Sequence, residues 1–345
     1  MRYIGGKSKI LPYLEGFLLE KLDSNHPRQL TFLDLFSGTG VVAKHFKNRF
    51  KVITNDNMYY SYILSRGSVT PNTPPLFSSL SDIGILDPVH HLGNLDGVRG
   101  FISEHYASEE DASPSNQRMY FTMKNAMRID AIRQQINTWL NDNAINQDEF
   151  DYLLAILIEA IPFISNTTGT YGAYLKKWDA RALKDLKLVN PILYDNNQEN
   201  LAFNQTAELL TQSITSDICY IDPPYNNRQY SSNYHLLETI AKYDSPNIRG
   251  VTGIREFEEG QVSNFCKKLK VLDAFEQVIT QVDCKHLIVS YSSDGLLSVQ
   301  KLKQLMMRNG KPETFDLKVI DYDTYKSKIV LRPKVDEYLL YIEKA

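Results

Sequence analysis

The fold of the chain is decided by the stretch ICYIDPPY, residues 218–225, in which an apolar run ends at two consecutive prolines. Neither proline can donate to a sheet ladder, and each restricts the preceding residue to an extended backbone. The stretch therefore predicts a strand that ends in a stiff loop carrying a carboxylate, bare carbonyls and an aromatic ring. Ligands bind at this carboxyl end of the strands in open α/β sheets. Taken alone, the loop is also compatible with a rigid turn that binds nothing.

An earlier stretch, residues 30–46, has the pattern of an apolar strand, a turn with two glycines and an amphipathic helix. Gly38 and Gly40 allow close approach of a ligand, and a helix start offers unbonded backbone N–H groups. The next apolar run ends at Asp56, where a carboxylate can accept hydrogen bonds from ribose hydroxyls. Because the third glycine of dinucleotide sites is absent and Asp34 lies in the strand, we expect a cofactor with a cationic amino-acid portion.

The composition is that of a soluble globular protein, with 345 residues, 43% hydrophobic and 23% charged, and a net charge of −3. This charge does not exclude a nucleic-acid partner, since a local basic groove matters more than the total. The three cysteines form no CxxC pair, so we expect neither a zinc cluster nor a disulfide framework. The N-terminus lacks an apolar export segment and no run approaches a membrane span, so we expect a cytoplasmic location.

A mostly helical insertion is predicted between the two halves of the α/β pattern, at residues 61–159. Residues 61–100 are rich in Ser, Pro and Gly and read as loop-rich, with short elements allowed at 84–100, whereas 119–139 and 150–161 carry apolar residues at helical spacing. We therefore assign 1–60 and 160–345 to one catalytic domain.

The second half of the pattern alternates strands and helices. A strand is expected at 191–195, leading to a cofactor-side loop with Gln198. Further expected elements are a helix from 236, helices at 265–282 and 296–309, a strand at 287–291, and a terminal antiparallel pair near 315–325 and 337–342.

These motifs in this order resemble the adenine-N6 DNA methyltransferases of the family that includes the bacterial Dam enzymes. More closely, they resemble the methylases that partner type IIS restriction enzymes. The resemblance lies in Arg2–Lys7, Phe32–Gly40, Asn55–Asp56, Asn166–Trp178, Asp222–Tyr230 and Val289–Ser293. It implies the family's α arrangement: a Rossmann-like methyltransferase sheet with helices on both faces and an antiparallel edge strand, plus a mostly helical target-recognition insertion.

The resemblance also implies the cofactor S-adenosyl-L-methionine (AdoMet), and no metal. Tyr3 stands where the family often has Trp, and Gln198 where an Asp commonly receives the amino group of the cofactor's adenine. The implied AdoMet contacts are Tyr3, Ile4, Gly5, Lys7, Asp34, Phe36, Ser37, Gly38, Gly40, Asp56, Gln198 and Asp222.

The chemistry implied for the loop after the 218–221 strand is methyl transfer to an amino group. The lone pair of adenine N6 is delocalised into the ring, so the nitrogen is a poor nucleophile. Asp222 and the carbonyl of Pro223 or Pro224 can accept its N–H groups and free that lone pair. Tyr225 would stack on the base, which must leave the double helix to be reached.

Candidate DNA contacts lie in two polar, aromatic segments. Residues 166–178 interleave glycine, aromatic and basic residues, which suits phosphate binding and base stacking. A plain solvent-exposed loop is the alternative there. The candidates are Asn166, Tyr171, Lys176, Lys177, Asn226, Arg228 and Tyr230.

Other functions remain as alternatives. Methylation of cytosine N4 or of adenine in RNA is one, although those enzymes more often have Ser or Asn in place of Asp222. A non-catalytic DNA-binding protein of the same fold is another, and an NAD-dependent oxidoreductase a third. Under the main hypothesis the partner is double-stranded DNA, with a separately encoded restriction endonuclease as a second candidate, in the bacterial cytoplasm at the nucleoid.

Overall fold

The computed structural model describes residues 6–22, 29–108, 118–258, 260–322 and 335–344, and they divide into two compact units. What we call the sheet unit comprises Lys7–Asn57, Gln198–Gln229 and Glu259–Ala345. The other unit, which we call the helical unit, consists almost entirely of Met58–Asn197 and Tyr230–Glu258. The helical unit thus includes residues 160–197 and 230–258, which the sequence assigned to the catalytic domain.

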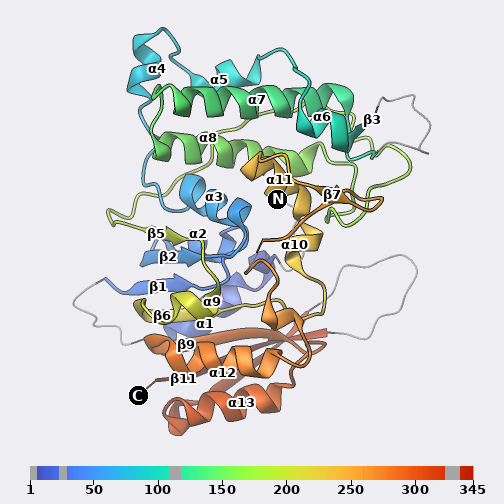
Figure 1. Cartoon of the computed structure of the whole chain (residues 1–345). Coiled ribbons are helices and arrows are strands. Elements are labelled where there is room, and N and C mark those ends of the chain that lie inside the picture. Colours follow the sequence, from blue (N-terminus) through green and yellow to red (C-terminus); the bar gives the residue numbers. More distant parts are fainter. Residues whose placement is uncertain (1–5, 23–28, 109–117, 259, 323–334, 345) are drawn as a thin grey trace. The chain divides into compact units, whose positions relative to one another are not determined.

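The sheet unit is built on one seven-stranded sheet, in the order β10-β11-β9-β6-β1-β2-β5 (Figure 1). The five strands from β9 to β5 are parallel, and β11 and β10 are antiparallel to their neighbours. This arrangement confirms the predicted α/β sheet with an antiparallel edge. The strands are β1 (Thr31–Asp34), β2 (Lys51–Asn55), β5 (Leu201–Phe203), β6 (Thr215–Ile221), β9 (Asp283–Ser292), β10 (Asp316–Tyr322) and β11 (Val335–Glu343).

Helices cover both faces of this sheet, because side chains along a strand alternate between its faces. In β6, Ile218 and Tyr220 pack into one core, whereas Cys219 and Ile221 pack into the other. The first core is closed by α1 (Leu11–Leu19) and α2 (Val41–Phe46). The second is closed by α9 (Ala207–Leu210), η3 (Asn264–Cys266), α12 (Val271–Gln281) and α13 (Val299–Arg308). The short helices η1 (Lys7–Lys9) and η4 (Pro312–Thr314) complete the sheet unit.

The register of the parallel strands brings three chain segments to one edge of the sheet. Asp34 at the end of β1 lies opposite Tyr220 of β6 and Thr54 of β2. The residues that follow these strands therefore emerge side by side. They are the glycine turn, Asp56 and the loop that begins at Asp222.

The helical unit is formed mainly by α7 (Met123–Asn141), α8 (Gln147–Ala160) and α3 (Tyr59–Ser68). The prediction that residues 61–100 are loop-rich is wrong for α3 and for one short helix at 78–82, whereas the short helix at 88–93 lies in the range 84–100 where short elements were allowed. Gly67 explains the close packing of α3, since a Cβ there would lie 2.3 Å from Cβ of Ala155 on α8. The remaining elements are α4 (Ser78–Asp82), α5 (Pro88–Gly93), α6 (Phe101–Tyr106), β3 (Ala107–Ser108), β4 (Phe121–Thr122), η2 (Ile161–Phe163), α10 (Tyr230–Asn233), α11 (His235–Lys242), β7 (Ile248–Arg249) and β8 (Ile254–Arg255).

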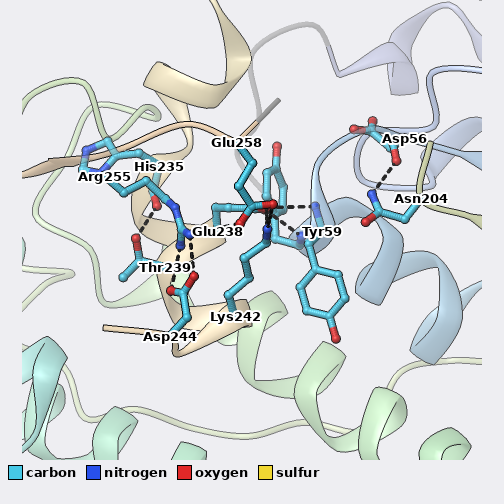
Figure 2. Close-up of polar contacts among 11 residues, drawn as sticks. Asp56, Tyr59, Asn204, His235, Glu238, Thr239, Lys242, Asp244, Arg255 and Glu258 are labelled. Atoms are coloured by element: carbon cyan, nitrogen blue, oxygen red, sulfur yellow. Dashed lines mark hydrogen bonds and ion pairs between the residues drawn. The ribbon is translucent and has the colours of Figure 1, made fainter. Parts of the chain in front are cut away.

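A buried carboxylate from α11 caps the start of α3. Met58, the residue before α3, makes no side-chain cap of its own. Instead, Glu238 accepts the backbone N–H groups of Tyr59 at 3.2 Å and Tyr60 at 3.0 Å (Figure 2). Lys242 lies between Glu238, at 3.6 Å, and the exposed Glu258, at 2.5 Å. The first turn of a helix has unbonded N–H groups, so this contact stabilises α3.

Candidate active site

The glycine turn after β1 is tied to the residues that end β2. Gly38 and Gly40 have φ angles of 52° and 72°, a conformation that residues with a side chain rarely adopt. The N–H of Ser37 donates to the carbonyl of Asn55 at 2.9 Å, and the N–H of Gly38 donates to Oδ2 of Asp56 at 2.9 Å. The predicted ribose acid and the predicted cofactor turn therefore form one hydrogen-bonded unit.

Asp34 is a buried carboxylate with open acceptor capacity. Its side chain is 1% exposed, and neither oxygen has a hydrogen-bond partner among the described residues. Burial raises the pKa of Asp34 well above its usual value, and the negative charges of Asp222 and Asp56 add to this, while the nearby N–H groups of Ala43 and Phe36 oppose it. A buried carboxylate of this kind is costly unless a ligand supplies the missing donors.

Asp222, at the end of β6, pairs with Lys7 from η1. The Nζ atom of Lys7 lies 2.9 Å from Oδ1 of Asp222 and 2.5 Å from Oε1 of Glu337 on β11. Burial alone would lower the pKa of Lys7, but the two carboxylates raise it above its usual value, so the ammonium stays charged. Burial raises the pKa of Asp222 above that of an ordinary aspartate; Lys7 opposes this shift, and Glu337 adds to it.

The loop after Asp222 is held in place by local contacts. The carbonyl of Tyr225 accepts the N–H of Leu296 at 2.9 Å, and Oδ1 of Asn226 accepts the N–H of Arg228 at 2.9 Å. Tyr225 is partly buried against the core of the sheet unit, and burial raises the pKa of its hydroxyl. With Pro223 and Pro224 restricting the backbone, the four predicted catalytic residues form one stiff loop.

The structure describes only some of the other residues that were predicted to bind the cofactor. Tyr3, Ile4 and Gly5 lie outside the described residues. Phe36 packs edge-on against Phe265, with ring centroids 5.0 Å apart. The contact of Lys7 with Asp222 was not foreseen, and its predicted contact with the cofactor stays a prediction.

The structure contradicts the predicted position of Gln198. Residues 191–195 form no strand, and Ile192 there is 85% exposed. The strand is β5, and Gln198 precedes it, whereas Asp56 follows the neighbouring parallel strand. Gln198 therefore lies toward the opposite end of the sheet from Asp56 and the glycine turn.

The residue that does follow β5 is Asn204, which the sequence reasoning missed. Its Nδ2 donates to the backbone carbonyl of Asp56 at 2.8 Å, and its side chain is exposed (Figure 2). The signal that could have found it is the short apolar triplet 201–203 followed directly by two amide residues.

Two of the residues predicted to contact DNA are buried and hydrogen-bonded inside the helical unit. Asn166 is fully buried; its Nδ2 donates to the carbonyl of Leu175 at 3.0 Å, and its Oδ1 accepts the N–H of Asp179 at 2.9 Å. Tyr171 is 3% exposed, its hydroxyl bonds Ser165, and its carbonyl accepts from Tyr120. These side chains shape the 166–179 loop from within, so we correct their assignment as DNA contacts.

The other predicted DNA contacts reach the surface. Lys176 and Lys177 are exposed and line a shallow hollow with Leu175, Trp178 and Asp179. Arg228 is exposed in the sheet unit, and Asn226 is partly exposed beside it. In the helical unit, Tyr230 begins α10 and stacks on Tyr234, with centroids 5.7 Å apart. Their contacts with DNA stay predictions.

The described residues offer neither a metal-binding cluster nor a membrane-spanning helix. No group of three or more His, Cys, Asp or Glu side chains there is arranged to hold a metal ion. In the same residues, no helix combines the length and apolar character needed to cross a bilayer.

The sequence matches a protein family over most of its length. Residues 3–305 match the model of the D12 class N6 adenine-specific DNA methyltransferases. The matched range contains the glycine turn, Asp56 and the Asp222 loop, and it ends before β10 and β11.

Individual relatives are similar across the whole chain. The chain is 46% identical over 348 residues to the type II methyltransferase M.FokI of Planomicrobium okeanokoites, and 40% identical over 348 residues to the modification methylase StsI of Streptococcus sanguinis. All of this chain aligns with each, but it spans about half of their length, 53% and 52%. The type II methyltransferase M.NlaIII of Neisseria lactamica is 36% identical over 328 residues, which cover 95% of this chain and 93% of that protein.

Proposed function

The chain belongs to the D12 class N6 adenine-specific DNA methyltransferase family, and on that premise we propose that it methylates N6 of an adenine flipped out of double-stranded DNA. We propose AdoMet as the methyl donor and a restriction-modification system as the context. The observation that carries this proposal is the position of Asp222. This residue directly follows β6, its carboxylate lies beside Lys7, and it is on the same edge of the sheet as Asp34 and Asp56.

The residues at this edge fit AdoMet. The two unpartnered oxygens of Asp34 suit the ammonium group of an amino acid, which offers several donors. Asp56, whose Oδ2 is fixed by Gly38, suits the ribose hydroxyls. For the adenine of the cofactor we propose Asn204 in place of Gln198, because an amide there can donate and accept. When bound, AdoMet supplies a methyl group activated by a positively charged sulfur.

The role proposed for Asp222 is to accept a hydrogen bond from the amino group of the target base. The carbonyl of Pro223 or Pro224 accepts the second N–H, so the nitrogen lone pair is less delocalised. Tyr225 stacks on the extruded base. Holding the nitrogen in line with the methyl group accounts for much of the acceleration. Asp222 need not be a strong base in this scheme.

We further propose that the helical unit recognises the target sequence. The exposed Lys176 and Lys177 would bind phosphates, and Asn226, Arg228 and Tyr230 would contact DNA next to the catalytic loop. Partners would be double-stranded DNA and a separate restriction endonuclease, in the bacterial cytoplasm.

The test is a methyl-transfer assay with labelled AdoMet and mixed-sequence duplex DNA, followed by digestion to nucleosides. The proposal predicts label in N6-methyl-2′-deoxyadenosine alone. Label in N4-methyl-2′-deoxycytidine, or label only when RNA is supplied, would select one of the alternative reactions. Absence of label with folded protein that binds DNA would favour a non-catalytic DNA-binding protein.

A further inference from the structure

Lys7 is shared between two carboxylates that come from different strands. Its Nζ atom contacts Oδ1 of Asp222 and Oε1 of Glu337, and the three side chains are only 9%, 15% and 10% exposed. Among the described residues, no hydrogen bond is made to Oδ2 of Asp222. The ammonium therefore holds Asp222 through one oxygen and leaves the other available.

Glu337 is itself held by the strand between β11 and β6. Ser290 of β9 donates its hydroxyl to Oε1 of Glu337 at 2.5 Å. β9 pairs with β11 on one side and with β6 on the other, where Val289 lies opposite Ile221. Three neighbouring strands thus fix the distance from Glu337 to the carboxylate that follows Ile221.

The placement of Glu337 is unusual for a glutamate. It lies directly before the run Tyr338–Ile342 of β11 and is buried, so its charge is costly unless it is paired. It also lies outside the range 3–305 that matches the family, whereas Lys7, Asp222 and Ser290 lie inside.

We propose that Glu337 is a positioning residue of the methyl-transfer site. Because Glu337 shares Lys7 with Asp222, it keeps one oxygen of Asp222 open for the target amino group. Without Glu337, the three N–H groups of Lys7 would be free to engage both oxygens of Asp222. A carboxylate paired in this way is a weaker acceptor. This inference rests on the proposed function.

The first test reads Asp222 directly, without DNA or cofactor. The pKa of Asp222 is followed by 13C NMR of aspartate-labelled protein, with its signal assigned from Asp222→Asn. Besides Lys7 and Glu337, the charged or titratable groups near Asp222 are Asp34, Tyr220 and Tyr225. Glu337→Gln removes only one negative charge and should lower this pKa by about one unit. An unchanged pKa would overturn the inference.

The second test is kinetic. Glu337→Gln should lower kcat for methyl transfer about tenfold, leave KM for DNA unchanged, and move the acidic limb of the pH profile to lower pH. The matched control is Glu343→Gln on the same strand, which breaks only a surface contact with Lys311 at 3.2 Å and should change none of these quantities. A Glu337→Gln protein that is less stable but has the wild-type kcat and pH profile would show a purely structural role.

A second variant covers the case in which Glu337→Gln does not fold. Ser290→Ala keeps every charge and removes the hydroxyl that anchors Glu337, so kcat should fall about threefold with KM unchanged. Wild-type kcat in a folded Ser290→Ala protein would overturn the inference. If wild-type protein transfers no methyl group at all, the proposed function fails as well. If wild-type protein is active and substitution of Glu337 leaves kcat unchanged, only the inference on Glu337 fails.

Discussion

In the helical unit, Asp130 and Glu238 are fully buried carboxylates that accept backbone N–H groups, whereas in the sheet unit the equally buried Asp34 accepts none. Asp130 caps α6 by accepting from Ile102 at 3.0 Å and Ser103 at 2.8 Å, and Tyr243 donates to it at 2.8 Å. Burial raises the pKa of all three carboxylates, and nearby N–H groups oppose that rise in each, together with the Tyr243 hydroxyl for Asp130 and the Lys242 ammonium for Glu238.

This difference separates carboxylates that hold the fold from carboxylates kept for a ligand. A satisfied buried carboxylate contributes to stability, and removing it leaves N–H groups without an acceptor. An unsatisfied one lowers stability and is retained where function needs it. Glu238 therefore belongs to the first class and Asp34 to the second. Asp222 belongs with Asp34, because only one of its oxygens is engaged.

The largest effect is expected for Asp222→Ala, which should lower kcat for methyl transfer about a thousandfold, because an acceptor of the amino group is lost. DNA affinity should remain, as measured by fluorescence anisotropy. Asp217→Asn, near the other end of β6, is the control, since the Asp217 carboxylate accepts from the backbone N–H and the hydroxyl of Thr31 at the start of β1. Its kcat should stay within about twofold of wild type. Equal turnover of Asp222→Ala and wild type would remove Asp222 from the site.

A stability effect without a catalytic one is expected for Glu238→Gln. The amide loses the charge that caps α3, so the free energy of unfolding should fall by about 2 to 3 kcal/mol. Glu258→Gln is the matched control, because Glu258 also pairs with Lys242 but is exposed and caps no helix. Chemical denaturation of both variants gives the comparison. A loss of similar size in both would mean that the cap contributes little.

Buried His235 should make the stability of the protein depend on pH. Burial lowers the pKa of His235 to about 4, with Arg255 and Arg118 acting in the same direction, although its contact with the carbonyl of Tyr171 opposes the shift. The unfolded chain, with a pKa near 6.5, binds more protons between these values, so stability rises with pH from about 4 to 6.5 and is constant above. Wild type should lose about 2 kcal/mol between pH 7.5 and pH 5.

The control for this prediction is His235→Gln, which can keep a donor to Tyr171 but does not titrate. Its loss of stability over the same pH interval should be smaller by about 2 kcal/mol. An equal loss in both proteins would mean that other groups cause the pH dependence.

A smaller effect is expected for Lys176→Ala combined with Lys177→Ala. Loss of two phosphate contacts should weaken DNA binding of every sequence about tenfold and reduce the slope of log affinity against log salt by about 2. Lys301→Ala combined with Lys303→Ala on α13 removes the same charge elsewhere and serves as the control. Equal salt slopes in both double variants would exclude Lys176 and Lys177 from the DNA contact.

Much of the sheet was predictable because its determinants are local. The apolar run 218–221 and the two prolines after Asp222 determine a strand and its end, and the positive φ angles of the turn favour its glycines. The position of β5 was missed because the apolar run 191–195 outweighs the triplet 201–203. Burial decides between them, and it is a tertiary property.

The roles of polar residues were harder to predict for the same reason. Asn166 has the composition expected of a DNA contact, but its amide folds the loop around it. Glu337 gives no signal in the sequence, because its contact with Lys7 joins residues 330 positions apart. The chemistry of the Asp222 loop could be inferred, whereas the network that supports it required the structure.

The central claim is that Asp34 is kept unsatisfied for a ligand, and the free energy of unfolding of Asp34→Asn tests it most directly. The variant should be at least as stable as wild type, because no hydrogen bond is lost, and its affinity for AdoMet should fall about tenfold as a charged partner is removed. Denaturation in urea, beside Glu238→Gln, measures the first quantity. A loss of about 2 kcal/mol or more in Asp34→Asn would contradict the claim, because it would show that this carboxylate stabilises the fold as Glu238 does.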